Sequence, residues 1–203
     1  MSSRSRQIGL GRVEVTGGFL LLAAALYYLD DQGILLWAAL ACVIHELGHV
    51  MAIYALGGRV SRLRVSVSGA EMALSAACPL GPGGHCLAAL AGPVSNLAVA
   101  MLSARMGENW FLFAGLNLSV AAFNLLPMAQ LDGGRALYYL IALLWSTRSA
   151  SRVTDILSRV TSVLLLLAGG VLLWVTRVNF TLLATALCLA ASLRQANPKD
   201  SGP

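Results

Sequence analysis

The apolar stretch at residues 33–55 limits the folds open to this chain more than any other feature. As a helix it is long enough to cross the hydrocarbon core of a membrane, which takes about 20 residues. Backbone polar groups in lipid must be satisfied within the segment, so a helix is the expected form. Yet His45, Glu46 and His49 stand in the middle of this stretch. Burying such groups in lipid is costly, which makes them a functional hypothesis from the outset.

The spacing of these three polar residues fits a metal site. Positions i and i+4 of a helix share one face, so His45 and His49 can bind the same metal ion. Glu46 follows His45 directly and can activate a metal-bound water as a general base. Satisfied core histidines beside a structural acid are the alternative. The spacing, the acid and the membrane burial agree better with a site for metal-assisted hydrolysis.

The composition extends the membrane assignment to the whole chain. Of its 203 residues, 58% are hydrophobic and 11% are charged, whereas soluble domains carry about 25% charged residues. Six apolar segments reach or approach the length of a membrane span. They cover residues 15–29, 33–55, 85–104, 109–126, 160–176 and 178–193. We therefore predict an all-α integral membrane protein with about six transmembrane helices, forming one polytopic domain over residues 1–203 with its core at about 15–193.

The basic residues predict which ends of the helices face the cytoplasm. With the N-terminus inside, twelve of the fourteen Lys and Arg residues fall on the cytoplasmic side. They are Arg4, Arg6, Arg12, Arg59, Arg62, Arg64, Arg135, Arg148, Arg152, Arg159, Arg194 and Lys199. Both termini are therefore expected in the cytoplasm. The net charge of +5 is explained by this topology, and no nucleic-acid partner is expected.

Residues 59–75 follow a different pattern from the apolar segments. Leu63, Val65 and Val67 alternate with polar residues, which is the period of a β-strand. A weaker strand pattern follows Gly69, so a small membrane-associated β-hairpin is predicted. An exposed edge of this hairpin could hold an unwound peptide by strand addition.

A catalytic zinc site usually needs three protein ligands and one open position. His85 is one candidate for the third ligand, but it stands at a predicted helix start, where a capping or interfacial role competes. Asp132 is the other candidate. It follows Pro127, which breaks the fourth helix, and precedes Gly133, which with its neighbour permits a tight turn. Asp132 could complete a His₂Asp site at membrane depth or cap a helix from a cytoplasmic loop, and its sequence surroundings leave both open.

Two motifs together resemble the site-2 protease family of intramembrane metalloproteases. One is His-Glu-x-x-His at 45–49, and the other is Asn-x-x-Pro-x-x-x-Leu-Asp-Gly-Gly at 124–134. The short six-span layout most resembles the bacterial sporulation branch, which releases a sigma factor from its membrane-bound pro-form. The resemblance covers about residues 15–193. It implies zinc as the cofactor, His45, His49 and Asp132 as its ligands, and Glu46 as the general base.

The same resemblance implies that two asparagines contact the substrate. Asn96 ends the segment Gly92-Pro93-Val94-Ser95-Asn96, which resembles the third core helix of the family and is expected to pack on the active-site helix. Asn124 resembles the family asparagine that binds the unwound substrate backbone. An interhelical hydrogen bond is the alternative role for an asparagine inside a membrane.

The chain departs from the family pattern at two points. Gln130 stands two residues before Asp132, where related sequences often have a proline. The resemblance therefore leaves the shape of this loop open. No nucleotide-sensing domain and no PDZ domain are expected, which argues against ATP control and PDZ-based gating.

The function expected from these features is intramembrane proteolysis. The enzyme would hydrolyse a peptide bond in or near a transmembrane segment of a membrane-bound protein, such as a pro-sigma or anti-sigma factor, in the bacterial cytoplasmic membrane. A membrane regulator and the lipid bilayer are the other expected partners. A non-proteolytic metal-binding or transport protein would use the same ligands without needing Glu46, although transporters usually show repeated halves. A pseudo-protease is disfavoured because all four candidate chemical residues are present.

Overall fold

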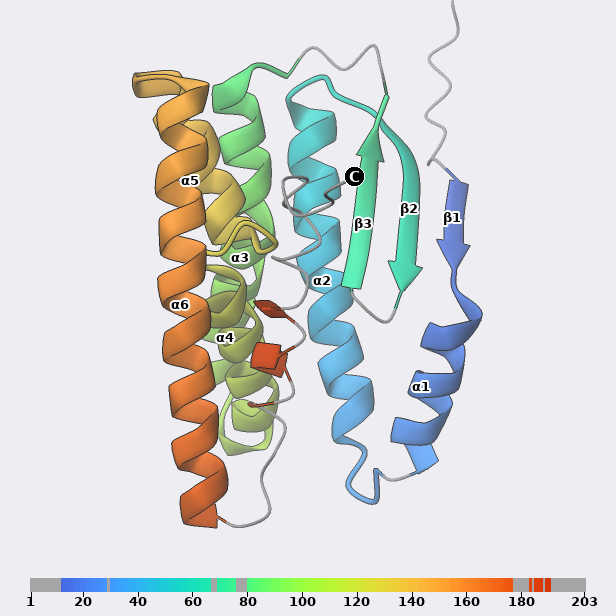
Figure 1. The fold of residues 1–203 in the computed structure, drawn as a ribbon. Coiled ribbons are helices and arrows are strands. Elements are labelled where there is room, and N and C mark those ends of the chain that lie inside the picture. The colour runs from blue at the N-terminus through green and yellow to red at the C-terminus, as the bar shows by residue number, and fades with distance from the viewer. Residues whose placement is uncertain are drawn as a thin grey trace, which may run out of the picture.

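A computed structural model describes most of the chain (Figure 1). The described residues are 12–28, 30–66, 69–75, 80–176, 183, 185–187 and 189–190. The apolar segment predicted at 178–193 lies largely outside them. The strands are β1 (Arg12–Val15), β2 (Val60–Ser66) and β3 (Gly69–Leu74). The helices are α1 (Gly17–Tyr28), α2 (Ile34–Ala55), α3 (Pro82–Ala104), the short 3₁₀ helix η1 (Glu108–Trp110), α4 (Phe111–Asn124), α5 (Asp132–Leu144) and α6 (Thr147–Thr176).

Helix α3 is the centre of the bundle. It packs against α2, α4 and α5, while α6 covers the outer side of α5. Figure 1 shows α4 in the lower half of the bundle and α5 in the upper half, so the two short helices together run along its length. The loop that joins them, residues 125–131, therefore lies near mid-height. Small residues fill the helix contacts, including buried Ala41, Ala88 and Ala121, as is usual where helices approach closely in membranes.

Three of the described helices, α2, α3 and α6, are long and apolar enough to cross a membrane. They correspond to three of the six predicted segments. Two other predicted segments form the shorter helices α1 and α4, which have 12 and 14 residues. The structure adds α5, which the sequence pattern did not identify as a helix. Its first turn holds two glycines and Arg135, so this part does not resemble a membrane segment.

Helix α6 begins well before the predicted apolar segment at 160–176. Residues 147–159, which carry several charged side chains, form its first turns. With 30 residues the helix is about 45 Å long, longer than the hydrocarbon core of about 30 Å. Large apolar side chains such as Leu164, Leu167 and Val171 are more than half exposed on its second half. This surface is suited to contact with lipid.

The predicted hairpin near 59–75 is confirmed. β2 and β3 pair antiparallel, with Leu63 opposite Met72. The structure adds β1, which pairs parallel to the other edge of β2 and leaves β3 as an edge strand. Ile53, Val60 and Ala88 form the buried cluster that joins the sheet to α2 and α3.

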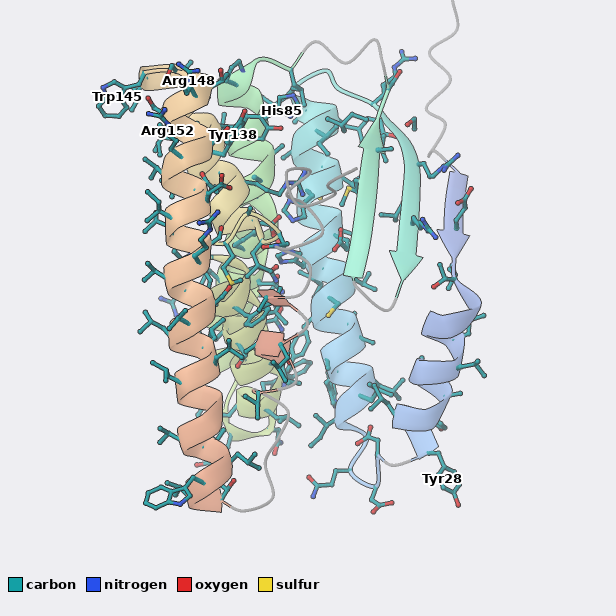
Figure 2. All side chains as sticks on the ribbon, viewed as in Figure 1. Tyr28, His85, Tyr138, Trp145, Arg148 and Arg152 are labelled. Atoms are coloured by element: carbon teal, nitrogen blue, oxygen red, sulfur yellow. The ribbon has the colours of Figure 1, made fainter. Side chains whose placement is uncertain are left out.

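Basic and aromatic side chains gather at one end of the bundle. Figure 2 shows Trp145, Arg148 and Arg152 there, near His85, and Tyr28 at the opposite end. Trp145 is 75% exposed. Aromatic and basic residues at this height are typical of a membrane interface.

The opposite end of α2 is capped by an acidic side chain. The Asp30 carboxylate accepts hydrogen bonds from the backbone N–H groups of Ile34 (3.0 Å) and Leu35 (2.7 Å). These donors have no carbonyl partner within the helix, so the carboxylate stabilises the helix start. Since α2 carries the histidines, the cap also fixes one end of the helix on which the site is built.

We expect Asp30→Ala to lower the free energy of unfolding by about 1 kcal/mol, because two N–H groups lose their acceptor. The measurement is thermal unfolding of the purified protein in detergent. The matched control is Asp31→Ala, since Asp31 is the exposed neighbouring acid. Equal midpoints for the two variants would contradict the assigned cap.

Candidate metal centre

Three buried side chains from two helices converge at mid-height in the bundle. His45 and His49 lie one turn apart on α2, with ring centroids 4.7 Å apart. Asp132, the first residue of α5, meets them from the other side. The exposed fractions of the three residues are 5%, 8% and 6%. The structure therefore brings together the two histidines with Asp132, and not with His85.

The distances within this cluster suit a single metal ion. The Nε2 atoms of His45 and His49 lie 2.9 Å and 3.1 Å from Oδ2 of Asp132 and 3.1 Å from each other. A tetrahedral zinc ion with bonds of about 2.0–2.1 Å places neighbouring ligand atoms about 3.3 Å apart. The three atoms thus have nearly the spacing of one face of such a site. Two imidazoles and a carboxylate are also a ligand set that zinc accepts.

A chain of buried amides orients His45. Asn117 on α4 donates to the backbone oxygen of Phe113, so its Oδ1 faces Asn96 and accepts a hydrogen bond of 2.8 Å. The Asn96 amide also donates to the backbone oxygen of Ala41, which leaves Oδ1 of Asn96 facing Nδ1 of His45 at 2.7 Å. That oxygen can only accept, so Nδ1 carries the proton and the lone pair of Nε2 points into the cluster.

His49 is oriented in the same way by backbone. Its Nδ1 lies 2.7 Å from the carbonyl oxygen of Ala88 on α3, which again places the proton on Nδ1 and leaves Nε2 free for a metal. α3 comes this close because Gly92 faces the imidazole: a Cβ at this position would overlap the ring atoms of His49. On α2, a Cβ at Gly48 would in turn lie 2.5 Å from Oγ of Ser95, which is on α3. Glycines on both helices therefore set the distance between α2 and α3.

The loop 125–131 places Asp132 in the cluster. Oγ of Ser158 on α6 accepts a hydrogen bond of 2.9 Å from the backbone N–H of Ala129 and donates one to the carbonyl oxygen of Thr154. Gly133 and Gly134 lie in the first turn of α5, where a Cβ would overlap the backbone of Leu125 and Met128. The prediction that these glycines form a tight turn is therefore wrong. They are needed because the helix start packs directly on the loop.

Two charged groups adjoin the cluster. Glu46 is partly buried and interacts electrostatically with both histidines, with Asp132 and with Arg135. Arg135 follows Asp132 by one helical turn, and its Nη1 lies 3.9 Å from Oδ1 of Asp132. The arrangement puts one carboxylate beside the metal ligands without making it one of them.

Two other candidate residues lie outside the cluster. Asn124 ends α4 and donates to the backbone oxygen of Val120 at 3.0 Å. His85 lies in the first turn of α3 and stacks on Tyr139 of α5 at a centroid distance of 4.7 Å. Sequence reasoning missed Asn117, Arg135 and Ser158. Of these three, the sequence indicates only Asn117, because it is an amide inside an apolar segment.

Comparison with known proteins agrees with this geometry. Residues 80–168 match the family model of peptidase family M50. A putative zinc metalloprotease of Xylella fastidiosa is 42% identical over 65 residues, which are 31% of this chain and 15% of that protein. Protease RseP of Yersinia pestis is 32% identical over 136 residues, which are 64% of this chain and 28% of that protein. The chain is thus similar to peptidase family M50 over residues 80–168 and to these zinc and RseP proteases over part of their length.

A solved structure extends the likeness to nearly the whole fold. The site-2 protease from Methanocaldococcus jannaschii superimposes with a TM-score of 0.66 over 90% of this chain and 89% of that one, at 18% identity. The chain spans less than a third of the length of the two proteases compared by sequence. With three apolar helices of spanning length and this likeness in fold, it is an integral membrane protein.

We expect Gly92→Ala to weaken metal binding about tenfold or more, because the added methyl group displaces the His49 ring. Metal affinity would be measured by competition with a chelator on the purified protein. Gly115→Ala on α4 is the matched control, since a Cβ there meets nothing within 4 Å. Unchanged affinity in Gly92→Ala would show that the α2–α3 distance does not govern the site.

Asn96→Ala should weaken metal binding about 10–100-fold, because His45 loses the acceptor that fixes its tautomer. The same chelator competition gives the readout, with Asn109→Ala in the exposed helix η1 as control. A fall in thermal stability with unchanged metal affinity would instead assign Asn96 a purely structural role.

Proposed function

We propose that this chain is an intramembrane zinc metalloprotease that hydrolyses a peptide bond in or near a transmembrane segment of a membrane-bound protein. The observation that carries the proposal is the buried His45–His49–Asp132 cluster with Glu46 beside it, on a helix long enough to span a membrane. The family supports the reaction class. The names of the zinc metalloprotease and RseP relatives support the cofactor and the protease activity.

Each residue has a defined task in this reaction. Nε2 of His45, Nε2 of His49 and the Asp132 carboxylate would hold the zinc ion. When bound, zinc supplies a Lewis acid that polarises a carbonyl group and acidifies water. The Glu46 carboxylate takes the proton from the attacking water and passes it to the leaving amine nitrogen. Arg135 balances the negative charge of the two acids beside it.

The depth of the site determines how a substrate must bind. His45 lies ten residues before the end of α2, or about 15 Å along the helix axis, so a transmembrane substrate meets it below the membrane surface. A helical substrate hides its carbonyls in hydrogen bonds and must unwind first. The free edge of β3 offers backbone partners for the unwound segment by strand addition.

The two predicted substrate-binding asparagines receive different roles. Asn96 is fully buried and its amide is used by Ala41, Asn117 and His45, so we assign it the orientation of His45 in place of substrate contact. Asn124 is partly buried and uses one donor on its own helix. Its carbonyl oxygen and second N–H group are left for a substrate backbone.

The topology that we propose has about six crossings, with α4 and α5 together forming one interrupted crossing and both termini in the cytoplasm. Support comes from eleven basic residues that fall on one side. Arg135, which was expected with them, instead lies beside Asp132 within the interrupted crossing. The protein would act in the bacterial cytoplasmic membrane, on a single-span pro-sigma or anti-sigma factor, under a membrane-bound regulator. The Salmonella relatives, which are named regulator of sigma E protease, support this substrate class.

A metal-binding or transport protein without protease activity is the alternative function. It would need the three ligands but no general base. The position of Glu46 beside the cluster favours the protease, because a carboxylate that binds no metal has a task there only in proton transfer.

Glu46→Gln should lower cleavage about a hundredfold or more, because the amide cannot accept the proton from water. The assay is co-expression with a panel of single-span reporters, scored by release of the cleaved fragment. Metal content is measured in parallel and is expected to equal that of the wild type, since Glu46 is not a ligand.

The matched control is Glu108→Gln, an exposed acid at the start of η1. Equal cleavage by wild type and Glu46→Gln would exclude Glu46 as the base. Bound metal without cleavage of any reporter by the wild type would favour the non-proteolytic alternative.

A further inference from the structure

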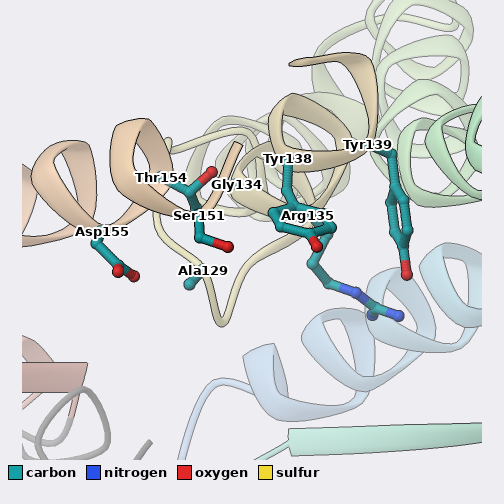
Figure 3. A pocket seen from close by; sticks show the side chains of 8 residues that line it. All are labelled: Ala129, Gly134, Arg135, Tyr138, Tyr139, Ser151, Thr154 and Asp155. Atoms are coloured by element: carbon teal, nitrogen blue, oxygen red, sulfur yellow. The ribbon is translucent and has the colours of Figure 1, made fainter. Parts of the chain in front are cut away.

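A polar cavity of about 310 Å³ lies between α5 and α6, next to the metal centre. Its lining residues come from the loop and from both helices (Figure 3). They are Ala129, Gly134, Arg135, Tyr138, Tyr139, Ser151, Thr154 and Asp155. Gly134 and Arg135 follow Asp132 by two and three residues, so the cavity begins where the metal cluster ends. A substrate bound at the cluster would therefore pass its neighbouring residues over this cavity.

The cavity lies near the end of the bundle where Arg148 and Arg152 gather. Asp155 is eight residues after Thr147, the first residue of α6, which places it about 12 Å along the helix axis. Asp155 lies on α6, lines the cavity together with Ala129 of the loop, and has an exposed side chain.

The charges in the cavity are separated. Figure 3 shows Arg135 directed toward the ribbon of α2 and Asp155 at the other end of the lining. Arg135 is balanced by Asp132 and Glu46. Within the part of the chain that the structure describes, no ion pair joins Asp155 to Arg152 or Arg159, its neighbours one turn away on α6. The Asp155 carboxylate is therefore free to bind a cation.

A buried hydroxyl completes the case for a ligand. Thr154 is 4% exposed, and its Oγ1 has no hydrogen-bond partner among the described residues. A buried polar atom without a partner costs about 1–3 kcal/mol, so a bound polar group would remove a penalty. The ring of Tyr138, which lines the same cavity, is suited to contact a cationic side chain, whereas the ring of Tyr139 is already stacked on His85.

We propose that this cavity is a substrate subsite that binds a Lys or Arg side chain on the cytoplasmic side of the cleaved bond, through Asp155. The proposal rests on the proposed protease function. Membrane-spanning segments carry their basic residues on the cytoplasmic side, and such a side chain extends through lipid to reach a polar partner. Pairing with Asp155 would fix how far the substrate enters, and hence which bond reaches the metal centre.

The test is binding of fluorescent single-span peptides to metal-loaded Glu46→Gln protein in detergent micelles. The peptides share one apolar segment, and a single residue among the eight that follow on the cytoplasmic side is Lys, Gln or Glu. At one or two adjacent positions, Lys should bind up to about fivefold more tightly than Gln, which is the upper end of what an exposed charge pair contributes. Asp155→Asn should bring this ratio to about one, and Asp155→Lys should make Glu the preferred residue.

Asp31→Asn, the same change at an exposed acid at the other end of α2, should keep the ratio. Equal affinity for Lys and Gln at every position, or a preference that survives Asp155→Asn, would overturn the subsite. A lipid amine could occupy the same carboxylate, but it would not make binding depend on the position of the lysine.

Cleavage of the same peptides by the wild type separates this proposal from the protease function. A lysine preference in binding without cleavage would support the subsite and contradict the protease function. Cleavage without any charge preference would support the protease function and overturn the subsite.

Discussion

The structure depends on two imidazole N–H groups finding acceptors inside an apolar bundle. Nδ1 of His45 is met by the side chain of Asn96, and Nδ1 of His49 by the backbone of Ala88. Both acceptors come from α3, so this one helix decides which nitrogen of each ring is available to a metal. An interhelical hydrogen bond in a membrane contributes only about 0.6 kcal/mol on average, whereas an outer-shell partner changes metal affinity about 10–100-fold. The contacts thus matter more for the site than for the stability of the bundle.

The requirement for close approach follows from these hydrogen bonds. A backbone carbonyl can reach a ring nitrogen at 2.7 Å only if the helices nearly touch, and Gly48 and Gly92 remove the side chains that would prevent it. Pro93 sits in the same turn of α3 and is fully buried. Larger residues at these positions would disturb the alignment of the imidazoles but would not displace the helices from the membrane. Apolar surface that faces lipid keeps α2 and α3 there in either case.

The sequence predicted the parts of the fold that rest on local patterns. The two histidines one turn apart, the long helices α2 and α3 and the hairpin of β2 and β3 all follow from residue spacing. Helix α5 and the first turns of α6 did not, because their charged and glycine residues resemble a cytoplasmic connection when no neighbouring helix is visible. Strand β1 was missed for a similar reason: it has four residues and is a strand only through its pairing with β2.

The residues of the candidate site also differ in whether a local sequence pattern predicts them. The motifs named His45, Glu46, His49 and Asp132, because ligand chemistry limits which residue types can serve. Local patterns left Asp132 and His85 both open, since both stand beside helix starts; the family resemblance named Asp132, and the structure brings Asp132 to the two histidines. Asn117 and Ser158 act through partners that are distant in sequence, so no local pattern marks their roles.

The loop 125–131 shows how irregular backbone is tolerated at this depth. The N–H groups of Leu125, Leu126, Met128 and Leu131 donate to carbonyl oxygens within the segment or in the last turns of α4. Pro127 has no N–H group to satisfy. Ala129 donates outside the segment, to Ser158 from α6. Unsatisfied backbone is excluded from lipid, so the loop that delivers Asp132 depends on α6 as well as on its own sequence. The helix that borders the polar cavity is thus also the one that holds the third metal ligand in place.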